Sequence, residues 1–329
     1  MTNSNKKIAI ITGVNGQDGS YLSEHLLDLG YFVIGLKRRT STITTERINH
    51  VYNNPNFKLK YYDLNDSSAC YRYINQYKPS EIYNLAAQSH VKVSFDVPSH
   101  TVDGIVQGTL NWLEAIRNID TSIKFYQASS SEMFGDSPVM LDKGYDEYSP
   151  LCPVSPYAAA KVCAHNLVGI YRRSYDLHAC AGILFNHESP RRGETFVTRK
   201  ITMAAAKIKL GLQKELRLGN LDAKRDWGFA GDYVKAMHLM LQQDKPYDYV
   251  IATGKTHSIE SFLKEVFDYA GLDYKHYLVI DPKLFRPIEV PYLLGNSSRA
   301  QEDLNWKPSV DMAQLAHMMY DEDLKLLQA

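Results

Sequence analysis

Two side chains that could move protons, Tyr157 and Lys161, lie four residues apart. Ser155 suits a helix N-cap and Pro156 the first helical position, so the sequence predicts a helix that begins here. On that helix the lysine ammonium would lie beside the phenol and lower the tyrosine pKa toward neutrality, as a base requires. The chain has 23 tyrosines, so this pair alone does not distinguish a catalytic site from coincidence.

A second group of reactive side chains, Ser129, Ser130, Ser131 and Glu132, follows an apolar segment at residues 124–128. That segment has the pattern of a buried strand. In an open parallel sheet, ligands bind beyond the carboxyl ends of the strands, so these hydroxyls and this carboxylate would lie where chemistry occurs. The alternative interpretation is a helix cap or turn, which is common at a serine-rich strand end.

The start of the chain predicts the elements that must position these groups. An apolar run at residues 7–12 is followed by a glycine-rich turn, a helical pattern from about residue 20 to Gly30, and a second strand at residues 31–36. Glycines in such a βαβ unit let the backbone approach a diphosphate, and the helix N-terminus favours an anion. The sequence therefore predicts dinucleotide binding by Gly13, Asn15, Gly16, Gln17 and Asp18.

The end of the second predicted strand indicates which dinucleotide binds. An NAD site usually has an acidic residue there for the ribose 2′-hydroxyl, whereas this chain has Lys37, Arg38 and Arg39. Arginine forks suit a 2′-phosphate, so the expected cofactor is NADP, held by Arg38 and Arg39. The alternative is a solvated basic loop.

Alternating strands and helices continue to residue 185 and predict an α/β fold with a doubly wound, parallel Rossmann-type sheet. Further strands are expected at residues 57–62, 81–85 and 178–184, and helices at 101–118 and 156–175. Polar or small residues after the third and fourth strands could contact the cofactor, although tight packing of ordinary turns explains the small ones equally well. These residues are Asp63, Leu64, Leu85, Ala86, Ala87 and Ser89.

The second half of the chain has a looser pattern. Residues 1–185 are expected to form the NADP-binding domain that carries the catalytic residues. Residues 186–329 are expected to form mainly a smaller α/β substrate-binding lobe, with some segments returning to the first domain. Its helices are expected at residues 198–210, 258–270 and 311–327.

Composition restricts the remaining possibilities. Lys plus Arg equals Asp plus Glu, at 37 each, so no global charge would recruit nucleic acid or a membrane surface. The four cysteines form no C-x-x-C pair, which suits reduced thiols better than a disulfide framework or a zinc site. No apolar run approaches the roughly 18 residues of a membrane span. We expect a cytoplasmic protein without a metal site.

The conjunction of these motifs resembles the extended short-chain dehydrogenase/reductase family and, within it, the dehydratases that act on GDP-mannose. The resemblance covers the chain from Lys7 onward and is most specific at residues 11–22, 84–95, 182–202 and 221–228. It implies an NADP-dependent lyase that converts GDP-mannose to GDP-4-keto-6-deoxymannose, a precursor of deoxysugar nucleotides such as GDP-fucose.

The resemblance also implies roles for the four candidate catalytic residues. Tyr157 would take the proton of the sugar 4-hydroxyl, with Lys161 tuning its pKa and Ser130 hydrogen-bonding the 4-oxygen. Glu132 would remove the 5-proton and pass one to the departing 6-hydroxyl. The family generally has Thr at position 130; Ser keeps the hydroxyl but lacks the methyl group that stiffens the rotamer.

In the remaining sites, basic residues would bind the diphosphate and Glu289 would accept guanine N–H groups. Cofactor contacts are implied for Lys161, His187 and Arg192. Substrate contacts are implied for Ser89, Asn186, Glu188, Val197, Lys200, Arg225, Arg286 and Glu289. The resemblance further implies a homodimer or homotetramer.

Two other functions remain open from the residues. A nucleotide-sugar 4-epimerase needs Tyr157 and Lys161 but has no need of the Glu132 carboxylate. A non-catalytic NADP-binding regulatory protein needs none of them, and the complete set of Ser130, Glu132, Tyr157 and Lys161 argues against it.

Overall fold

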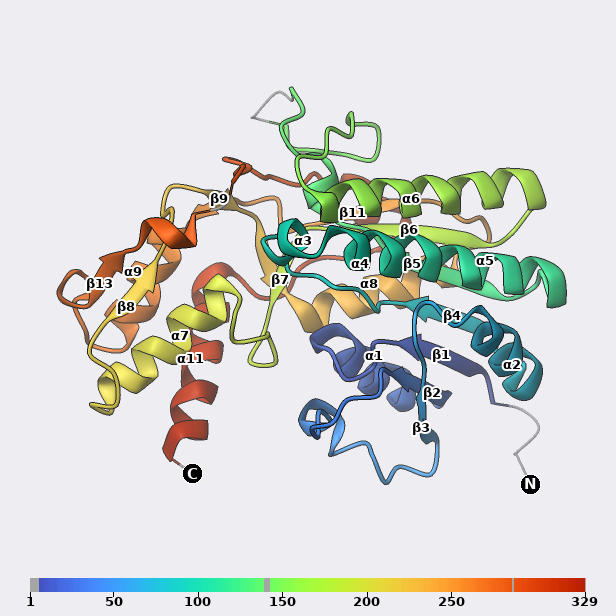
Figure 1. The fold of residues 1–329 in the computed structure, drawn as a ribbon, viewed down its shortest axis with the longest axis horizontal. Coiled ribbons are helices and arrows are strands. Elements are labelled where there is room, and N and C mark those ends of the chain that lie inside the picture. The colour runs from blue at the N-terminus through green and yellow to red at the C-terminus, as the bar shows by residue number, and fades with distance from the viewer. Residues whose placement is uncertain (1–5, 139–142, 286, 329) are drawn as a thin grey trace.

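The computed structural model describes residues 6–138, 143–285 and 287–328. Its larger lobe is built on a seven-stranded sheet with the strand order β11-β6-β5-β4-β1-β2-β3 (Figure 1). Every neighbouring pair in this sheet is parallel. The strands are β1 (Ile8–Thr12), β2 (Phe32–Lys37), β3 (Phe57–Tyr61), β4 (Glu81–Asn84), β5 (Lys124–Ala128), β6 (Ala179–Leu184) and β11 (Tyr249–Ile251).

Helices cover both faces of this sheet, so β1, β4 and β5 are buried along almost their whole length rather than on alternate residues. One face packs against α1 (Gln17–Asp28), α8 (Ala230–Gln242) and α10 (Ser298–Leu304). The other face packs against α2 (Ser67–Tyr77), α5 (Gly108–Ile119) and α6 (Pro156–Tyr175). The expected doubly wound parallel α/β fold is confirmed.

The strand order indicates where on the sheet a ligand would bind. β1 pairs with β2 on one side and with β4 on the other. The strands that follow β1 are therefore added on one side as far as β3 and on the opposite side from β4 onward, so the strand order reverses between β1 and β4. At such a switch point the loops beyond the carboxyl ends diverge and leave a crevice. The predicted glycine turn follows β1, and the predicted Ser130 and Glu132 follow β5 on the same edge.

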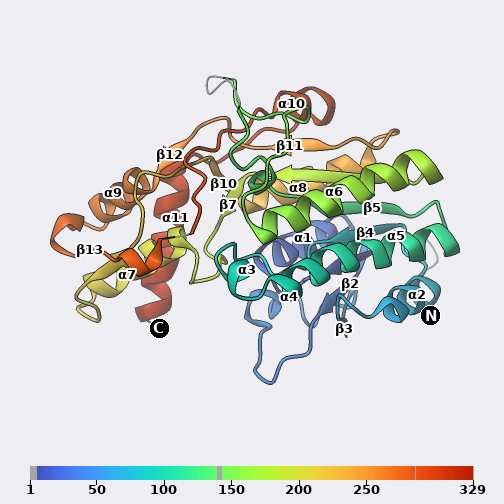
Figure 2. The same ribbon diagram turned by 45° about the horizontal axis from the view of Figure 1, so that its top comes forward.

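The smaller lobe lies beside the carboxyl edge of the sheet, at the left of Figures 1 and 2. Its core is formed by α7 (Val197–Lys209), α9 (Ile259–Tyr269) and α11 (Met312–Gln328), together with the parallel pair β8 (Leu216–Leu218) and β13 (Leu278–Ile280). Inside it, the buried Asp323 accepts a hydrogen bond from Thr202 Oγ1 (2.6 Å) and pairs with Arg199 Nη2 (2.6 Å). This buried pair joins α11 to α7.

Short strands connect the two lobes. β7 (Asn186–Glu188) pairs in parallel with β10 (Trp227–Phe229), and β9 (Lys224–Arg225) pairs antiparallel with β12 (His257–Ser258). The chain then returns from the smaller lobe to the larger one, because α8 and α10 pack on the main sheet and β11 forms its edge.

The helix expected at residues 101–118 is formed, but its type changes along its length. The chain forms α3 (Val93–Asp96), α4 (Pro98–Val102), a π-helical segment (Asp103–Gln107) and then α5. Gly104 and Gly108 border the Leu64 side chain so closely that an added Cβ would lie 3.4 and 3.0 Å from it. The expected helix is thus present without a break and contains one π-helical segment.

Candidate active site

A cavity of about 810 Å³ lies at the carboxyl edge of the sheet, between the two lobes. It is lined by the loops that follow β1, β2, β3, β4, β5 and β6 and by residues of the smaller lobe. Predicted residues at this cavity are Gly13, Asn15, Gly16, Gln17, Asp18, Arg38, Asp63, Leu64, Leu85, Ala86, Ala87, Ser89, Ser130, Glu132, Tyr157, Lys161, Asn186, His187, Glu188, Arg192, Val197, Lys200, Arg225 and Glu289.

Two predicted residues are not placed at this cavity. Arg39 is exposed and lies outside the lining. Arg286 lies outside the described residues.

The glycine loop after β1 forms a tight turn. Gly13 has φ +68°, which favours glycine, and an added Cβ at Gly19 would lie 2.4 Å from the Gly13 carbonyl oxygen. Within the described part of the chain, no side chain caps α1 at Gly16. The amino end of α1 therefore leaves its first N–H groups facing the cavity, as an anion site requires.

Ser130 and Glu132 lie in a short turn directly after β5. Ser130 Oγ accepts a hydrogen bond from the Glu132 backbone N–H at 3.2 Å and caps the 3-10 turn Ser131–Met133. Both side chains line the cavity although each residue is at least nine-tenths buried. The carboxylate of Glu132 is thus presented to a bound molecule from a largely dry wall.

Tyr157 and Lys161 lie one turn apart near the start of α6, as predicted. Ser155 Oγ caps the helix by accepting from the Ala158 N–H at 3.1 Å. Lys161 Nζ donates to the Ala128 carbonyl oxygen at 2.6 Å and lies 5.7 Å from the centre of the Tyr157 ring.

The pKa values of this pair differ from the expectation. Burial lowers the pKa of Lys161 to about 8. Burial also raises the pKa of Tyr157 to about 12; a hydrogen bond to Ser130 lowers it and the charge of Glu132 raises it further. The expected lowering of the tyrosine pKa by Lys161 is wrong for this structure, because desolvation dominates and the ammonium is directed to the Ala128 carbonyl.

A partly buried ion pair at the cavity wall joins the glycine loop to β7. His187 Nε2 lies 2.8 Å from Asp18 Oδ2, and His187 Nδ1 lies 2.7 Å from the Phe185 carbonyl oxygen. Both neighbours are acceptors, so the ring satisfies both only as an imidazolium that donates twice. Burial lowers the pKa of His187, but the charge and hydrogen bond of Asp18 outweigh it and leave the pKa raised.

The same pair acts on Asp18. Burial raises the pKa of its carboxyl, but the charge and hydrogen bond of His187 outweigh this and lower it to about 2. Gln17 strengthens the connection, because its Nε2 donates to the His187 carbonyl oxygen at 3.1 Å and its Oε1 accepts from Ser189 Oγ at 2.9 Å. The amino end of α1 is therefore bonded firmly to the segment that enters the smaller lobe.

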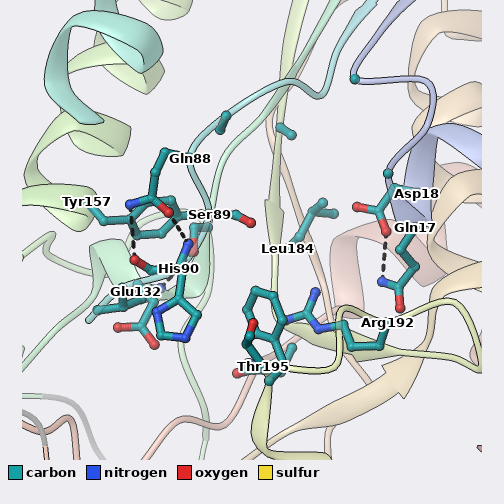
Figure 3. A pocket seen from close by; sticks show the side chains of 18 of the residues that line it. Gln17, Asp18, Gln88, Ser89, His90, Glu132, Tyr157, Leu184, Arg192 and Thr195 are labelled. Carbon is teal, nitrogen blue, oxygen red and sulfur yellow. Dashed lines mark hydrogen bonds between the residues drawn. The ribbon is translucent and has the colours of Figure 1, made fainter. Parts of the chain in front are cut away.

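Figure 3 shows how the labelled side chains divide across the cavity, with Tyr157, Glu132 and His90 on one side and Asp18, Gln17 and Arg192 on the other. Arg192 Nε lies 3.0 Å from Glu188 Oε2, and its guanidinium lies 3.7 Å from the centre of the Phe196 ring. Arg192 therefore reaches the cavity with a fixed orientation.

The polar residues predicted for the substrate are partly paired with one another. Arg225 Nη2 donates to Glu289 Oε1 at 2.7 Å, and Arg225 Nη1 donates to the Val290 carbonyl oxygen at 2.8 Å. Burial lowers the pKa of Lys200. The buried Oδ1 of Asn186 has no hydrogen-bond partner among the described residues, as suits an acceptor for a ligand hydroxyl.

Sequence reasoning left several lining residues unassigned. Gln88 Oε1 accepts from the His90 N–H at 2.6 Å, and Gln88 Nε2 donates to the His90 carbonyl oxygen at 3.1 Å (Figure 3). The His90 ring lies 5.4 Å from that of Phe196, which comes from the other lobe. The sequence signal that could have indicated a place at the cavity was position alone: Gln88 and His90 follow β4, and Phe196 precedes α7. Further lining residues are Thr44, His100, Thr195 and Trp227.

Among the described residues no group of three or more His, Cys, Asp or Glu side chains could hold a metal ion. Cys70, Cys152, Cys163 and Cys180 are all free. No helix in the described ranges is long and apolar enough to cross a membrane.

A parallel sheet with this order, a glycine turn after β1, and a serine, tyrosine and lysine at its carboxyl edge define the extended short-chain dehydrogenase/reductase class. Two solved structures share the fold. A dTDP-glucose 4,6-dehydratase from Bacillus anthracis in complex with NAD has a TM-score of 0.85 and 20% identity, with 98% of each chain covered. A UDP-glucose 4-epimerase from Thermotoga maritima with UDP-glucose has a TM-score of 0.84 and 22% identity, covering 97% of this chain and 99% of the other.

Sequence comparison is more specific. The profile described as GDP-mannose 4,6 dehydratase matches residues 10–319, and the chain belongs to this family. The Arabidopsis thaliana GDP-mannose 4,6 dehydratase 1 is 55% identical, covering 98% of this chain and 91% of the relative. The Homo sapiens GDP-mannose 4,6 dehydratase is 47% identical, covering 98% and 93%.

Proposed function

We propose that this chain is an NADP-dependent GDP-mannose 4,6-dehydratase, which converts GDP-mannose to GDP-4-keto-6-deoxymannose and water. The observation that carries the proposal is the convergence of Ser130, Glu132, Tyr157 and Lys161 on one cavity. The family and the names of the relatives support the substrate. Residues 1–185 supply the cofactor site in this proposal, and residues 186–329 supply most of the substrate site.

The residues present suit a nicotinamide dinucleotide. The glycine turn, whose Gly19 has no space for a Cβ, and the uncapped amino end of α1 would hold its diphosphate. Arg38 lines the cavity beyond β2 and would hold a 2′-phosphate. Lys37 is buried, and its Nζ donates to Thr44 Oγ1 at 3.2 Å. When bound, NADP supplies a hydride acceptor for sugar C4 and later a hydride donor for C6.

The chain's own part in the first stage is proton removal and charge stabilisation. Tyr157 takes the proton of the 4-hydroxyl as its phenolate, a form that burial disfavours and that positive charge from Lys161 and bound NADP would favour. Ser130 donates a hydrogen bond to the 4-oxygen. The Lys161 ammonium, held by Ala128, supplies positive charge beside the phenol. A 4-ketone results, and it acidifies the hydrogen on the neighbouring C5.

Glu132 performs the elimination. Its carboxylate removes the C5 proton and then gives a proton to the 6-hydroxyl, so that the C6–O bond breaks and water leaves. A C5–C6 double bond conjugated to the ketone forms. Protonation at C5 by Tyr157, which holds the proton of the 4-hydroxyl, or by solvent accompanies the reduction at C6 and completes the 6-deoxy product. The atoms balance as GDP-mannose giving GDP-4-keto-6-deoxymannose plus one water.

The smaller lobe would bind the nucleotide end of the substrate. Lys200 and Arg225 place positive charge in the cavity, and the pair of Arg225 with Glu289 fixes the Glu289 carboxylate as an acceptor for guanine N–H groups. Asn186 Oδ1 would accept from a sugar hydroxyl. These assignments are predictions, as is the substrate contact of Arg286.

The first experiment tests whether the protein forms the product of the proposed reaction. Purified protein incubated with GDP-mannose and NADP should form the 4-keto-6-deoxy sugar nucleotide, detected by mass spectrometry as the loss of one water. Absence of that product at every cofactor concentration would reject the proposal.

Glu132→Gln tests the elimination separately. Loss of a general acid-base group should lower product formation by roughly a hundredfold or more, while the 4-keto sugar still accumulates. Glu302→Gln changes an exposed glutamate and serves as the control. Turnover of Glu132→Gln equal to wild type would remove the proposed mechanism.

The same variant distinguishes the second candidate, a nucleotide-sugar 4-epimerase. The fold shared with a UDP-glucose 4-epimerase is compatible with that activity. An epimerase would invert C4 without losing water and would tolerate Glu132→Gln. The buried position of Glu132 beside Tyr157 at the cavity favours the dehydratase.

Cofactor choice has its own test. NADP should bind more tightly than NAD, and Arg38→Ala should raise the NADP dissociation constant roughly tenfold to a hundredfold because a charge-assisted contact is lost. Arg39→Ala tests the neighbouring exposed arginine. Tighter binding of NAD than of NADP by the wild-type protein would contradict the assignment.

Assembly and location complete the proposal. We propose a cytoplasmic homodimer or homotetramer, for which the family resemblance is the support. Sedimentation velocity of the purified protein tests the assembly, and a monomer at all concentrations would reject it.

A further inference from the structure

Helix α6 contacts the end of β5 through side chains on three successive turns. Tyr157, Lys161 and His165 are spaced by four residues and so lie on one face of the helix. Lys161 Nζ donates to the Ala128 carbonyl oxygen at 2.6 Å. One turn later, His165 Nδ1 lies 3.1 Å from Ser129 Oγ.

The remaining contact, that of Tyr157, involves the reacting groups of the proposed mechanism. Tyr157 is hydrogen-bonded to the Ser130 side chain, so residues 128–130 each meet one turn of α6. Two of the three contacts belong to residues already placed in the mechanism. The contact between His165 and Ser129 has no assigned role there.

The first half of α6 packs largely through small side chains, whereas Val168 and Tyr171 in its second half enter the core beneath the sheet. The buried residues of its first half include Ala158, Ala160 and Ala164, each at most 2% exposed. Alanine methyl groups give a smooth surface, and burial of apolar area has no preferred direction. Hydrogen bonds do have a preferred distance and angle, so those to residues 128–130 restrict the axial position of the first half of α6, while Tyr171 and Arg172 hold its far end through Glu114 and Asp248.

The contact between His165 and Ser129 is well suited to restricting the axial position of α6. Burial lowers the pKa of His165, so near neutral pH the ring is uncharged and has one donor and one acceptor nitrogen. The Ser129 hydroxyl can rotate to serve either tautomer. Ser129 itself is 4% exposed, so water competes little for the bond.

We propose that His165 is a positioning residue: its hydrogen bond to Ser129 sets the axial position of α6 against β5 and thereby places Tyr157 and Lys161 over the cavity. The kinetic consequence rests on the proposed dehydratase function. The geometric consequence does not, because it concerns only the distance between Lys161 and Ala128.

Two substitutions separate positioning from general stability. His165→Leu removes the bond and keeps comparable bulk, and leucine has the higher helix propensity. His165→Asn retains a polar atom at the δ position, although asparagine has the lower propensity. Helix stability alone therefore favours Leu, whereas positioning favours Asn. Asn166→Leu alters the exposed neighbouring residue and is the control.

We expect His165→Leu to lower kcat about tenfold with KM within twofold of wild type, the effect of losing one buried hydrogen bond. His165→Asn should recover most of that loss, and Asn166→Leu should match wild type. A wild-type kcat for His165→Leu, or an equal loss in the Leu and Asn variants, would overturn the inference.

A crystal structure of His165→Leu gives a readout that needs no activity. The inference predicts that Lys161 Nζ moves beyond hydrogen-bond distance of the Ala128 oxygen, from the 2.6 Å of the native chain. An unchanged Lys161 contact would overturn it. If the wild-type protein fails to convert GDP-mannose, the proposed function fails, and this structure still decides the role of His165.

Discussion

Replacing Asp18 by Asn removes one charge from the partly buried pair that joins the glycine loop to β7. The two side chains are 23% and 11% exposed for Asp18 and His187, so solvent screens the pair only weakly. Asn keeps the shape and one acceptor oxygen. The substitution therefore tests the charge of the pair rather than the packing around it.

The expected magnitude follows from the pKa of Asp18. Its shift from 3.8 to about 2 on folding corresponds to about 2 kcal/mol of stabilisation of the charged, folded form. Removing one member of a buried pair can cost about 3 kcal/mol or more when the other charge stays unpaired. Here His187 can lose its proton, so we expect a loss near the smaller value.

The dependence on pH has a definite sign. The folded pKa of Asp18 lies below its unfolded value of 3.8, so its contribution is complete above that pH and is lost as the pH falls toward 2. The folded pKa of His187 lies above its unfolded value of 6.5, so its contribution is complete below that pH and is lost as the pH rises through the folded value. The pair stabilises the protein most between these limits.

Urea unfolding of wild type and Asp18→Asn without added cofactor, at about pH 5.5 and about pH 9, measures the effect. The variant should lose about 2 kcal/mol at the lower pH and clearly less at the higher pH. NMR titration should show a lower pKa of His187 in the variant, because burial, the largest influence on that ring, then acts without Asp18. Asp28→Asn, an exposed change on the same helix, is the control.

Two results would refute this reasoning. An equal loss of stability at both pH values would mean that the charge pair is not the cause. An unchanged pKa of His187 in Asp18→Asn would mean that Asp18 does not hold the imidazolium.

Further substitutions test the glycine turn, the smaller lobe and the cofactor loop. Gly19→Ala should abolish dinucleotide binding, measured by fluorescence titration, since the added Cβ would lie 2.4 Å from a backbone oxygen; the added Cβ of Gly169→Ala in α6 meets only the ends of two arginine side chains, Arg172 and Arg173, so this variant should bind normally. Asp323→Asn should lower the free energy of unfolding by about 3 kcal/mol, because Arg199 is left buried without its ion pair; calorimetry showing no change would contradict this. Arg38→Ala should reduce NADP affinity more in low salt than in high salt, as expected for a contact between charges.

The main sheet was predictable because its signals are local. β5 and α6 have the predicted bounds, since an apolar run and a Ser-Pro helix start depend only on neighbouring residues. The glycine turn was predictable for the same reason, although α1 begins at Gln17 rather than near residue 20. The π-helical segment at Asp103–Gln107 was not predicted, because the pattern of residues 101–118 does not distinguish it from α-helix.

The types and spacing of the reactive side chains were determined by the sequence alone: a serine and a glutamate after a strand, and a tyrosine and a lysine one turn apart. Only the tertiary structure decided what surrounds them. It placed His187 against Asp18, 169 residues earlier, and directed Lys161 to a backbone carbonyl 33 residues earlier. It also raised the pKa of Tyr157 instead of lowering it. Desolvation and distant charges set these properties, and both depend on how remote segments pack together.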